Sequence, residues 1–369
     1  MIANGTVYSE GRFFKGYVEF DEGVITGVVE GAPTGKIIAN GLVIPLLANC
    51  HTHIGDTSLR GMMIDSQTTL EELVRPPDGL KHRLLSQQSE KTMVGAMGDA
   101  IDEMRTLGIG RYVDFREGGL QGLQQFKDAA RIHPYPKPIA LSRPKELNYS
   151  EDEVEELLGQ SDGIGISAMR DWSYDDLHML AGHVKRRKKM FALHASEGER
   201  EDISSILELE PDFLVHMSCA MKDDLLACKD ADIPIVVCPR SNKRFGIRLD
   251  IARMLDIGID VCIGTDNAML HDLSVFEELR AAYSLSGNCR RLDAVEVFKL
   301  AVENSRKVLY DKGVITIAAG NPCEFMVLKA GKNDSPEELM RTGRGHSIEL
   351  VSIGSKTWKS EEWKRSRGS

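Results

Sequence analysis

The sequence predicts an α/β fold, a (β/α)8 TIM barrel with a small flanking β-sandwich domain built from both chain ends. The first observation behind this prediction is a series of short apolar runs, rich in β-forming residues, that alternate with helical patterns. The second is a short alternating β pattern at both ends of the chain. The third is a length of 369 residues with 42% hydrophobic residues, which is enough to bury a large core.

The predicted barrel strands follow one another along the middle of the chain, with a helical pattern between most neighbouring pairs. Such alternation is typical of right-handed βαβ units in a parallel sheet, and units of this kind over roughly 250 residues fit a (β/α)8 barrel. The strands are expected at residues 42–50, 110–115, 137–144, 163–169, 190–196, 212–218, 233–239 and 260–266, with clear helical patterns at 92–107, 122–132, 150–159, 174–189 and 275–284.

A doubly wound open sheet is the main alternative to the barrel. The stretch GIGISA, residues 163–168, matches the loose Gly-x-Gly-x-x-Ala pattern of dinucleotide-binding turns. The match lies within an apolar run rather than after one, and polar sequence precedes it. It therefore gives the open sheet little support.

The chain ends differ from the middle in their short, Gly-broken β segments. We expect residues 1–41 plus 313–369 to form one composite β-sandwich domain, and residues 42–312 to form the barrel. The polar last twelve residues, 358–369, are expected to be loose.

Composition excludes several classes of function. A formal net charge of −10 argues against a nucleic-acid binder or a protein of anionic membrane surfaces. The basic run at residues 185–189 closes a predicted helix, where cations suit the helix dipole. The seven cysteines include no Cys-x-x-Cys pair, and no signal peptide or membrane-spanning run is evident, so we expect a cytoplasmic protein. A monomer and a homo-oligomer both remain open.

Polar side chains gather at the ends of four predicted strands, where barrel enzymes place their chemistry. Residues i and i+2 of a strand face the same side, so the two histidines of the stretch His-Thr-His can grip one ion. A lone His-x-His is a weak signal, but joined by a third histidine and an aspartate at other strand ends it predicts a metal site. The residues are His51, His53, His194, Glu197, His216 and Asp266.

Some of these residues also have a plainer explanation. Glu197 stands among other acids and could be one more solvated carboxylate. His216 taken alone resembles a satisfied core histidine, and Asp266 could cap the helix that follows. Their shared position at strand ends favours the functional interpretation.

With these residues in place, the chain resembles the amidohydrolase superfamily. The resemblance is to the branch that contains cytosine and guanine deaminases, S-adenosylhomocysteine-type nucleoside deaminases and triazine chlorohydrolases. It is carried, in the right order, by the stretches NCHTHIGDTSLRG, LHASE, LVHMS, CPRSN and GTDN followed by VFEELR. The flanking β-domain is also similar to that of the family.

The resemblance implies a ligand set and a catalytic set. His51, His53, His194 and Asp266 would bind one divalent metal, Glu197 would shuttle protons, and His216 would be a hydrogen-bonding catalytic group. Two-metal members of the family carry a carboxylated lysine at the end of strand four, whereas this chain has Ser-Ala-Met-Arg at residues 167–170. One metal is therefore expected. Zinc suits the mixed nitrogen and oxygen donors, and Fe²⁺ or Mn²⁺ would fit them too.

The resemblance also implies hydrolytic deamination of a nitrogen-rich heterocycle, such as a pyrimidine, purine, nucleoside or pterin, with release of ammonia, and the chemistry of the site agrees with it. A catalytic metal lowers the pKa of bound water from about 15.7 to about 7. Asp266 would take the proton of the water, Glu197 would protonate the ring, and His216 would stabilise the developing charge. Hydrolysis of a cyclic amide, or of another C–N or C–halide bond, is the alternative on the same site. A binding protein that has lost activity is disfavoured by the complete ligand set.

Further residues are weaker candidates for substrate contact. Ser241 and Asn242 of CPRSN match the family, but they could equally shape the loop. Arg60 could reach a substrate or pair on the surface, and His271 is close enough to Asp266 to line a pocket. Cys219 stands where many relatives have a second histidine. The segment at residues 62–85 lacks the usual length and sequence of the family's loop that frames the substrate, so the substrate stays undetermined.

Overall fold

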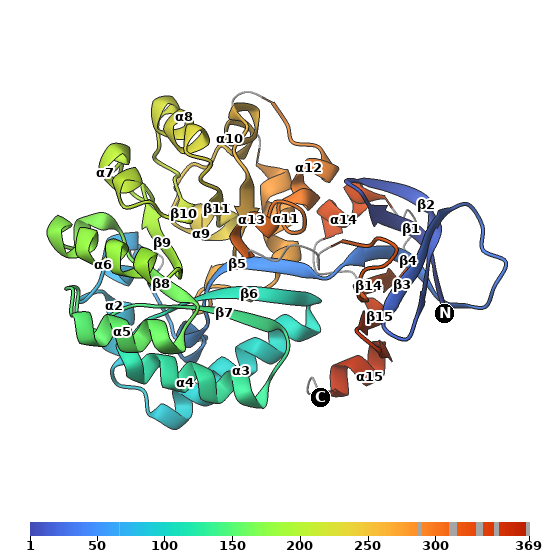
Figure 1. Cartoon of the computed structure of the whole chain (residues 1–369), viewed down its shortest axis with the longest axis horizontal. Coiled ribbons are helices and arrows are strands. Elements are labelled where there is room, and N and C mark those ends of the chain that lie inside the picture. The colour runs from blue at the N-terminus through green and yellow to red at the C-terminus, as the bar shows by residue number, and fades with distance from the viewer. Residues whose placement is uncertain (66, 286–289, 310–315, 330–334, 343–346, 367–369) are drawn as a thin grey trace.

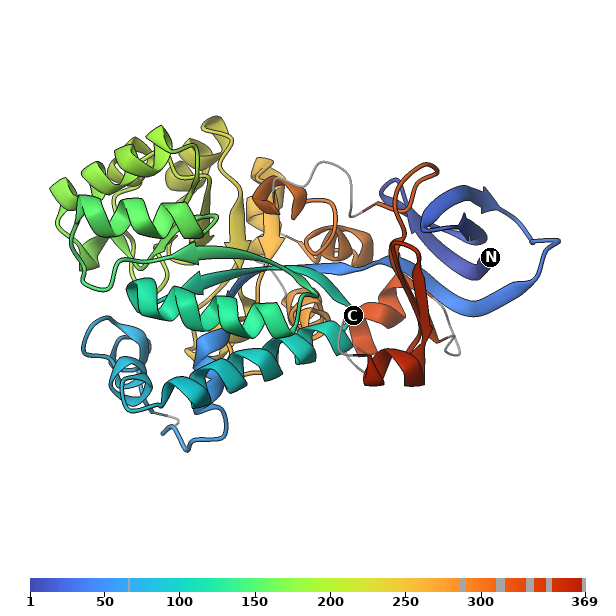
Figure 2. The same ribbon diagram turned by 60° about the horizontal axis from the view of Figure 1, so that its bottom comes forward.

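The computed structural model describes residues 1–65, 67–285, 290–309, 316–329, 335–342 and 347–366. Two sheets organise these residues into a mixed α/β fold (Figure 1). A curled parallel sheet surrounded by helices forms the larger part, and a second sheet made from both chain ends lies beside it (Figure 2). Parts of the predicted β-domain, residues 313–315, 330–334, 343–346 and 367–369, lie outside the described residues.

The parallel sheet has the order β12-β11-β10-β9-β8-β7-β6-β5-β13. β12 and β13, at the two ends of this order, are consecutive in the chain. Gly264 between them donates its N–H to the carbonyl of Val237, and Thr265 donates to that of His51. The predicted last strand is therefore present as two short pieces, each paired with a different end of the sheet. The strands are β5 (Leu47–His53), β6 (Ile109–Arg116), β7 (Lys137–Ser142), β8 (Gly163–Ile166), β9 (Met190–Ala195), β10 (Phe213–His216), β11 (Ile235–Val237), β12 (Val261–Ile263) and β13 (Asp266–Asn267).

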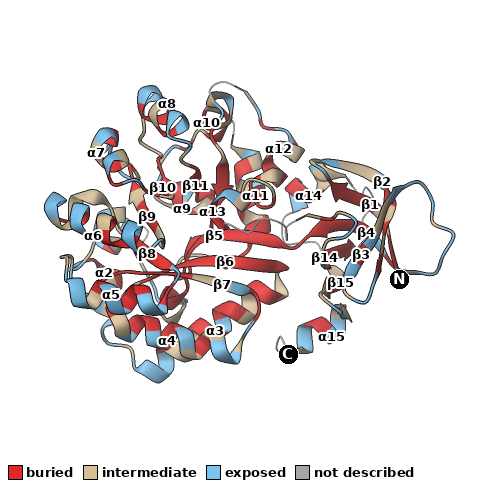
Figure 3. Cartoon of the chain, viewed as in Figure 1, coloured by how far each residue is buried: buried red, intermediate tan, exposed pale blue. Residues whose placement is uncertain are grey.

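Helices cover the outer face of the parallel sheet. Figure 3 shows buried strands in the middle and exposed outward faces on the surrounding helices, and the apolar residues of both layers form one large core. Serine side chains begin several of the helices by accepting an N–H of the first turn, as Ser89 does from Thr92. The helices here are α3 (Glu90–Thr106), α4 (Gly119–Ile132), α5 (Glu151–Gln160), α6 (Tyr174–Arg186), α7 (Ile203–Glu208), α8 (Lys222–Asp230), α9 (Pro239–Arg244), α10 (Ile251–Ile257), α11 (Val275–Ser284), α12 (Ala294–Lys299), α13 (Arg306–Leu309) and α14 (Pro336–Thr342).

The segment between β5 and α3 contains short elements that the sequence did not predict. They are the 3-10 helix η1 (Ile54–Leu59) and the helices α1 (Leu70–Val74) and α2 (Leu80–Leu85); a further 3-10 helix, η2 (Met169–Asp171), follows β8. Within the described ranges, no helix combines the length and the apolar character needed to cross a lipid bilayer.

The flanking sheet has the order β16-β15-β14-β4-β1-β2-β3 and encloses a small core of its own. Its described strands form one continuous sheet rather than the two sheets of the expected sandwich. The sheet curls, so that Val24 of β3 forms a bridge with Pro322 just before β14. The strands are β1 (Ile2–Ser9), β2 (Arg12–Asp21), β3 (Val24–Glu30), β4 (Ile37–Pro45), β14 (Glu324–Lys329), β15 (Ile348–Ile353) and β16 (Lys356–Lys359).

Two predictions at the domain junction were wrong in detail. The apolar run 42–50, expected as one barrel strand, is divided: residues 42–45 pair with β1 and β14 in the flanking sheet, and only the part from Leu47 enters the parallel sheet. The chain end, expected to be loose, forms β16 and α15 (Ser360–Arg365). Trp363 of α15 is 2% exposed and packs under the guanidinium of Arg105.

Candidate active site

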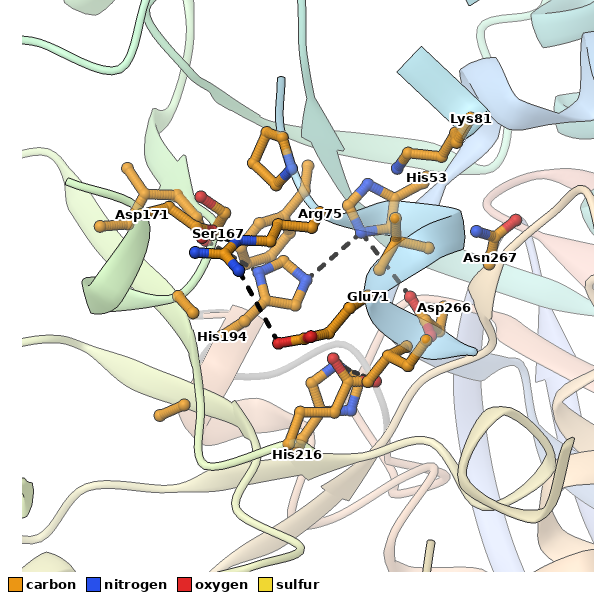
Figure 4. A pocket seen from close by; sticks show the side chains of 18 of the residues that line it. His53, Glu71, Arg75, Lys81, Ser167, Asp171, His194, His216, Asp266 and Asn267 are labelled. Carbon is orange, nitrogen blue, oxygen red and sulfur yellow. Dashed lines mark hydrogen bonds and ion pairs between the residues drawn. The ribbon is translucent and has the colours of Figure 1, made fainter. Parts of the chain in front are cut away.

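The predicted site residues meet at the carboxyl end of the parallel sheet. His51 and His53 end β5, His194 lies near the end of β9, His216 ends β10 and Asp266 begins β13. Parallel strands bring their carboxyl ends to the same edge, which explains why residues so far apart in sequence converge. Figure 4 shows His53, His194, His216 and Asp266 pointing toward one another across a cavity that all four line.

The imidazole nitrogens and one carboxylate crowd around a single point. The Nε2 atom of His194 is 3.2 Å from Nε2 of His51 and 3.3 Å from Nε2 of His53. Asp266 Oδ1 is 3.3 Å from Nε2 of His51 and 3.7 Å from Nε2 of His53. Ligand atoms of His51, His194, His216 and Asp266 all lie within 4.8 Å of one another, as a metal site requires.

The donor chemistry of this cluster fits a cation. His194 Nδ1 lies 2.8 Å from the carbonyl oxygen of Ile166, and because only an N–H can bond to a carbonyl, Nε2 keeps its lone pair for the cluster. Burial lowers the pKa of His194 and of His53 well below 6.5, so both rings are neutral at pH 7. Neutral rings whose nitrogen lone pairs face one another repel, and a metal ion between them removes that repulsion.

Asp266 is the charged member of the cluster. Burial alone would raise its pKa, but the hydrogen bond from His51 and the neighbouring imidazoles lower it well below 3.8. Ser241 on α9 donates a hydrogen bond of 2.5 Å to Asp266 Oδ2, which holds the carboxylate in place. Asp266 also has a φ of 58°, a left-handed backbone conformation that turns its side chain toward the histidines.

Glu197 and His216 form a pair beside the cluster. His216 Nε2 is 3.5 Å from Glu197 Oε1, and both residues line the cavity. Burial, reinforced by the charge of Asp266, raises the pKa of Glu197 well above 4.5, whereas burial lowers the pKa of His216 to about 4. Both shifts favour the uncharged forms of the pair, a protonated carboxyl group and a neutral imidazole.

The weaker candidates for substrate contact do not line this cavity in the described part of the chain. Ser241 is occupied with Asp266, and Asn242 donates to Ser218 Oγ at 2.9 Å, because both stand on the buried first turn of α9. Arg60 donates to the carbonyl of Ala268 and to Glu103, so it braces the loop after β13. His271 lies in the same loop, outside the cavity lining.

Several cavity residues were missed in the sequence. Glu117 and Arg143 directly follow β6 and β7, so the same strand-end rule that found the histidines could have found them. Lys81 on α2 and Arg75 after α1 also line the cavity, but their segment shows no pattern that points inward. The end of β8 supplies Ser167 and no lysine, as expected.

The model of the amidohydrolase family matches residues 42–353. The chain belongs to the amidohydrolase family. An uncharacterised protein from Methanocaldococcus jannaschii is 33% identical over 334 residues, which cover 85% of this chain and 86% of that protein. A 5-methylthioadenosine/S-adenosylhomocysteine deaminase from Halalkalibacterium halodurans is 24% identical, with 88% and 82% covered.

A solved structure has a similar fold over most of the chain. The zinc-bound adenosine deaminase from Xanthomonas campestris has a TM-score of 0.78 at 19% identity, with 98% of this chain and 93% of that chain covered. At this identity the likeness shows the fold. Family membership, together with the deaminase-named relatives, identifies the chain as a hydrolase that acts on carbon–nitrogen bonds.

Proposed function

We propose that the protein is a mononuclear metal-dependent aminohydrolase that deaminates a nitrogen-rich heterocycle and releases ammonia. The observation that carries the proposal is the Glu197–His216 pair standing beside the histidine–aspartate cluster in one cavity. A metal-binding cluster alone would suit many proteins. A proton-holding carboxyl group next to that cluster is what hydrolysis of a C–N bond needs.

The proposed metal ligands are His51, His53, His194 and Asp266. His216 also lies within reach of the cluster, but its Nε2 faces Glu197, which suits a catalytic group better than a ligand. When bound, one divalent ion, with zinc as the favoured species, would activate water for attack at neutral pH. The absence of a lysine at the end of β8 supports a single ion.

The other residues of the site handle protons. Asp266 accepts a proton from the attacking water at a carboxylate oxygen. Glu197, whose raised pKa favours its protonated form, gives its proton to a ring nitrogen and then carries one to the leaving amine. His216 stabilises the negative charge that develops on the oxygen atom bonded to the ring carbon.

We also infer that the parallel sheet closes into a (β/α)8 barrel that begins at Leu47, and that the two chain ends, with residues 42–45 on the side of the flanking sheet, form the flanking domain. Two facts support closure: β12 and β13 are consecutive in the chain, and they stand at opposite ends of the strand order.

Ammonia release tests the proposal. Metal-loaded protein is assayed on nucleobases, nucleosides, pterins and triazines, with the Glu197→Gln variant as a matched blank whose metal content is measured in parallel. We expect ammonia from one substrate class, and none from the variant although it still binds one metal per chain. No ammonia from any class by fully metal-loaded protein, or undiminished activity of the variant, would overturn the proposal; in the first case hydrolysis of a cyclic amide becomes the better explanation.

A further inference from the structure

A group of buried charged side chains borders the cavity next to the histidine–aspartate cluster. Lys81 on α2 is 3% exposed, and Figure 4 shows it beside His53. Its Nζ atom is 3.1 Å from Glu117 Oε1 and 3.2 Å from Asp56 Oδ2. Lys81 and Glu117 both line the cavity, whereas Asp56 lies behind them and is fully buried.

Lys81 and Glu117 both carry their charges at neutral pH. Burial alone would lower the pKa of Lys81, but Asp56 and Glu117 outweigh it and raise the pKa above 10.5. Burial alone would raise the pKa of Glu117, but Lys81, Arg143 and His82 bring it well below 4.5. An ammonium donor and a carboxylate acceptor therefore stand side by side on the cavity wall.

Each member of this pair keeps hydrogen-bonding capacity. The ammonium group of Lys81 has three N–H donors, so its contacts with Glu117 and Asp56 leave one N–H for a ligand. Glu117 Oε2 is buried and has no hydrogen-bond partner among the described residues; Nδ1 of His82, a neutral ring at pH 7, is 3.8 Å away. Buried polar atoms are almost always paired in a native protein, so this free acceptor calls for a ligand.

A purely structural role explains less. Lys81 could tie α2 to the barrel through Asp56 alone, and a buried ion pair stabilises no better than apolar residues of the same volume. Neither argument accounts for a second carboxylate that stands on the cavity wall with a free oxygen.

We propose that Lys81 and Glu117 select the substrate by binding a ring carbonyl and the N–H next to it. Lys81 donates to the carbonyl oxygen, and Glu117 accepts from the adjacent ring N–H. A ring that carries only an amine and acceptor nitrogens would place a lone pair against the Glu117 carboxylate and is rejected. This inference rests on the proposed function, and it narrows the substrate class to oxo-substituted aminoheterocycles.

Matched ring pairs test the selection in the unaltered protein. Isoguanine and adenine differ in the 2-oxo group, and cytosine and 4-aminopyrimidine differ in the same way, while each pair keeps its leaving amine. Calorimetry with metal-free protein measures binding, and ammonia release by metal-loaded protein measures turnover. We expect the oxo ring of each pair to bind about 30-fold more tightly and to be the better substrate, because its analogue leaves a buried group unpaired.

Variants then assign the selection to these two residues. Lys81→Met and Glu117→Gln should each reduce the preference for the oxo ring to within about threefold. Lys91→Met, which alters an exposed lysine of α3 away from the cavity, should keep the full preference. The double variant Asp56→Asn/Lys81→Met avoids an unpaired buried carboxylate if the single lysine variant does not fold.

The outcomes separate this inference from the proposed function. Ammonia from adenine and 4-aminopyrimidine at the same rate as from their oxo partners, with equal binding, would leave the aminohydrolase intact and overturn the role of the pair. Tighter binding of oxo rings without ammonia from any ring would uphold the pair and count against deamination. Equal binding without turnover would overturn the role of the pair, and the aminohydrolase would then be decided by the wider panel of nucleosides, pterins and triazines.

Discussion

At the scale of single residues, the site depends on side chains that do not themselves line the cavity, such as Ser241. Ser241 was a candidate for substrate contact or for shaping the loop, and its hydroxyl group bonds to the carboxylate of Asp266. The hydrogen bond removes rotational freedom from a proposed ligand before any metal arrives. Residues that orient ligands in this way commonly contribute 10- to 100-fold to metal affinity.

The Ser241→Ala variant is therefore expected to bind zinc about tenfold more weakly while keeping its fold. Competition with a fluorescent chelator measures the dissociation constant. Ser205→Ala, on the surface helix α7, should match the unaltered protein. An unchanged affinity in Ser241→Ala would show that Asp266 needs no such support.

His82 provides a pH-dependent contribution to stability that one substitution can isolate. Burial lowers its pKa to about 4, with Lys81 and Arg143 acting in the same direction and Glu117 against them. The ordinary value is about 6.5, so the folded state binds this proton less readily than the unfolded chain does. The contribution of His82 is fully present above pH 6.5 and is lost as the pH falls toward 4.

His82→Gln keeps a donor for the carbonyl of Val74, 2.9 Å from Nε2, but does not titrate. The unfolding free energy of the unaltered protein, relative to this variant, should fall by up to about 3 kcal/mol between pH 7 and pH 4. Denaturant titrations of both metal-free proteins at a series of pH values measure the difference. A difference that is constant with pH would mean that His82 takes up its proton without penalty.

At the scale of elements, the break between β12 and β13 shapes the metal site. A Cβ at Gly264 would come within 2.6 Å of the Cβ of His51 and 2.9 Å of its backbone. Only glycine lets the strand pass this close to the first proposed ligand. The Gly264→Ala variant should therefore bind less than one metal per chain, as measured by elemental analysis after gel filtration.

Gly159→Ala is the matched control, because nothing lies within 4 Å of a Cβ placed there. Its position in α5 predicts full metal content and a stability raised by up to about 1 kcal/mol. A full metal complement in Gly264→Ala would show that His51 can shift and still bind.

The C-terminal helix α15 is held by packing that its polar sequence conceals. Arg105 donates to the carbonyl of Trp363 and lies 4.8 Å from the centre of the indole ring. Trp363→Ala should destabilise the protein by about 3 to 5 kcal/mol, which chemical denaturation measures. Lys364→Ala, an exposed neighbour, should change stability by less than about 0.5 kcal/mol. Equal effects of the two substitutions would mean that α15 is not docked.

At the scale of the whole molecule, the sequence predicted the elements whose buried residues recur in a regular pattern, namely the parallel strands. The parallel strands are continuous apolar runs because both of their faces are covered, and their ends then located the histidine–aspartate cluster. The division of the run 42–50 between two sheets could not be predicted, because a strand that is buried in either sheet has the same kind of apolar residues. Trp363 was missed because one buried residue in a polar stretch leaves no periodic signal. Lys81 was missed because buried lysines are rare, so a lysine is expected on the surface.

The passage of the chain from β4 to β5 has a consequence for how this protein could be taken apart. Leu46 alone separates the last residue of β4 from the first of β5, so the strand that carries His51 and His53 is a direct extension of the flanking sheet. There is no linker in which to cut, and a single inserted residue would shift the alternation of side chains and turn both histidines away from the cavity. The flanking sheet therefore cannot be exchanged as a module, and any redesign of it has to preserve the register of the strand that it hands to the active site.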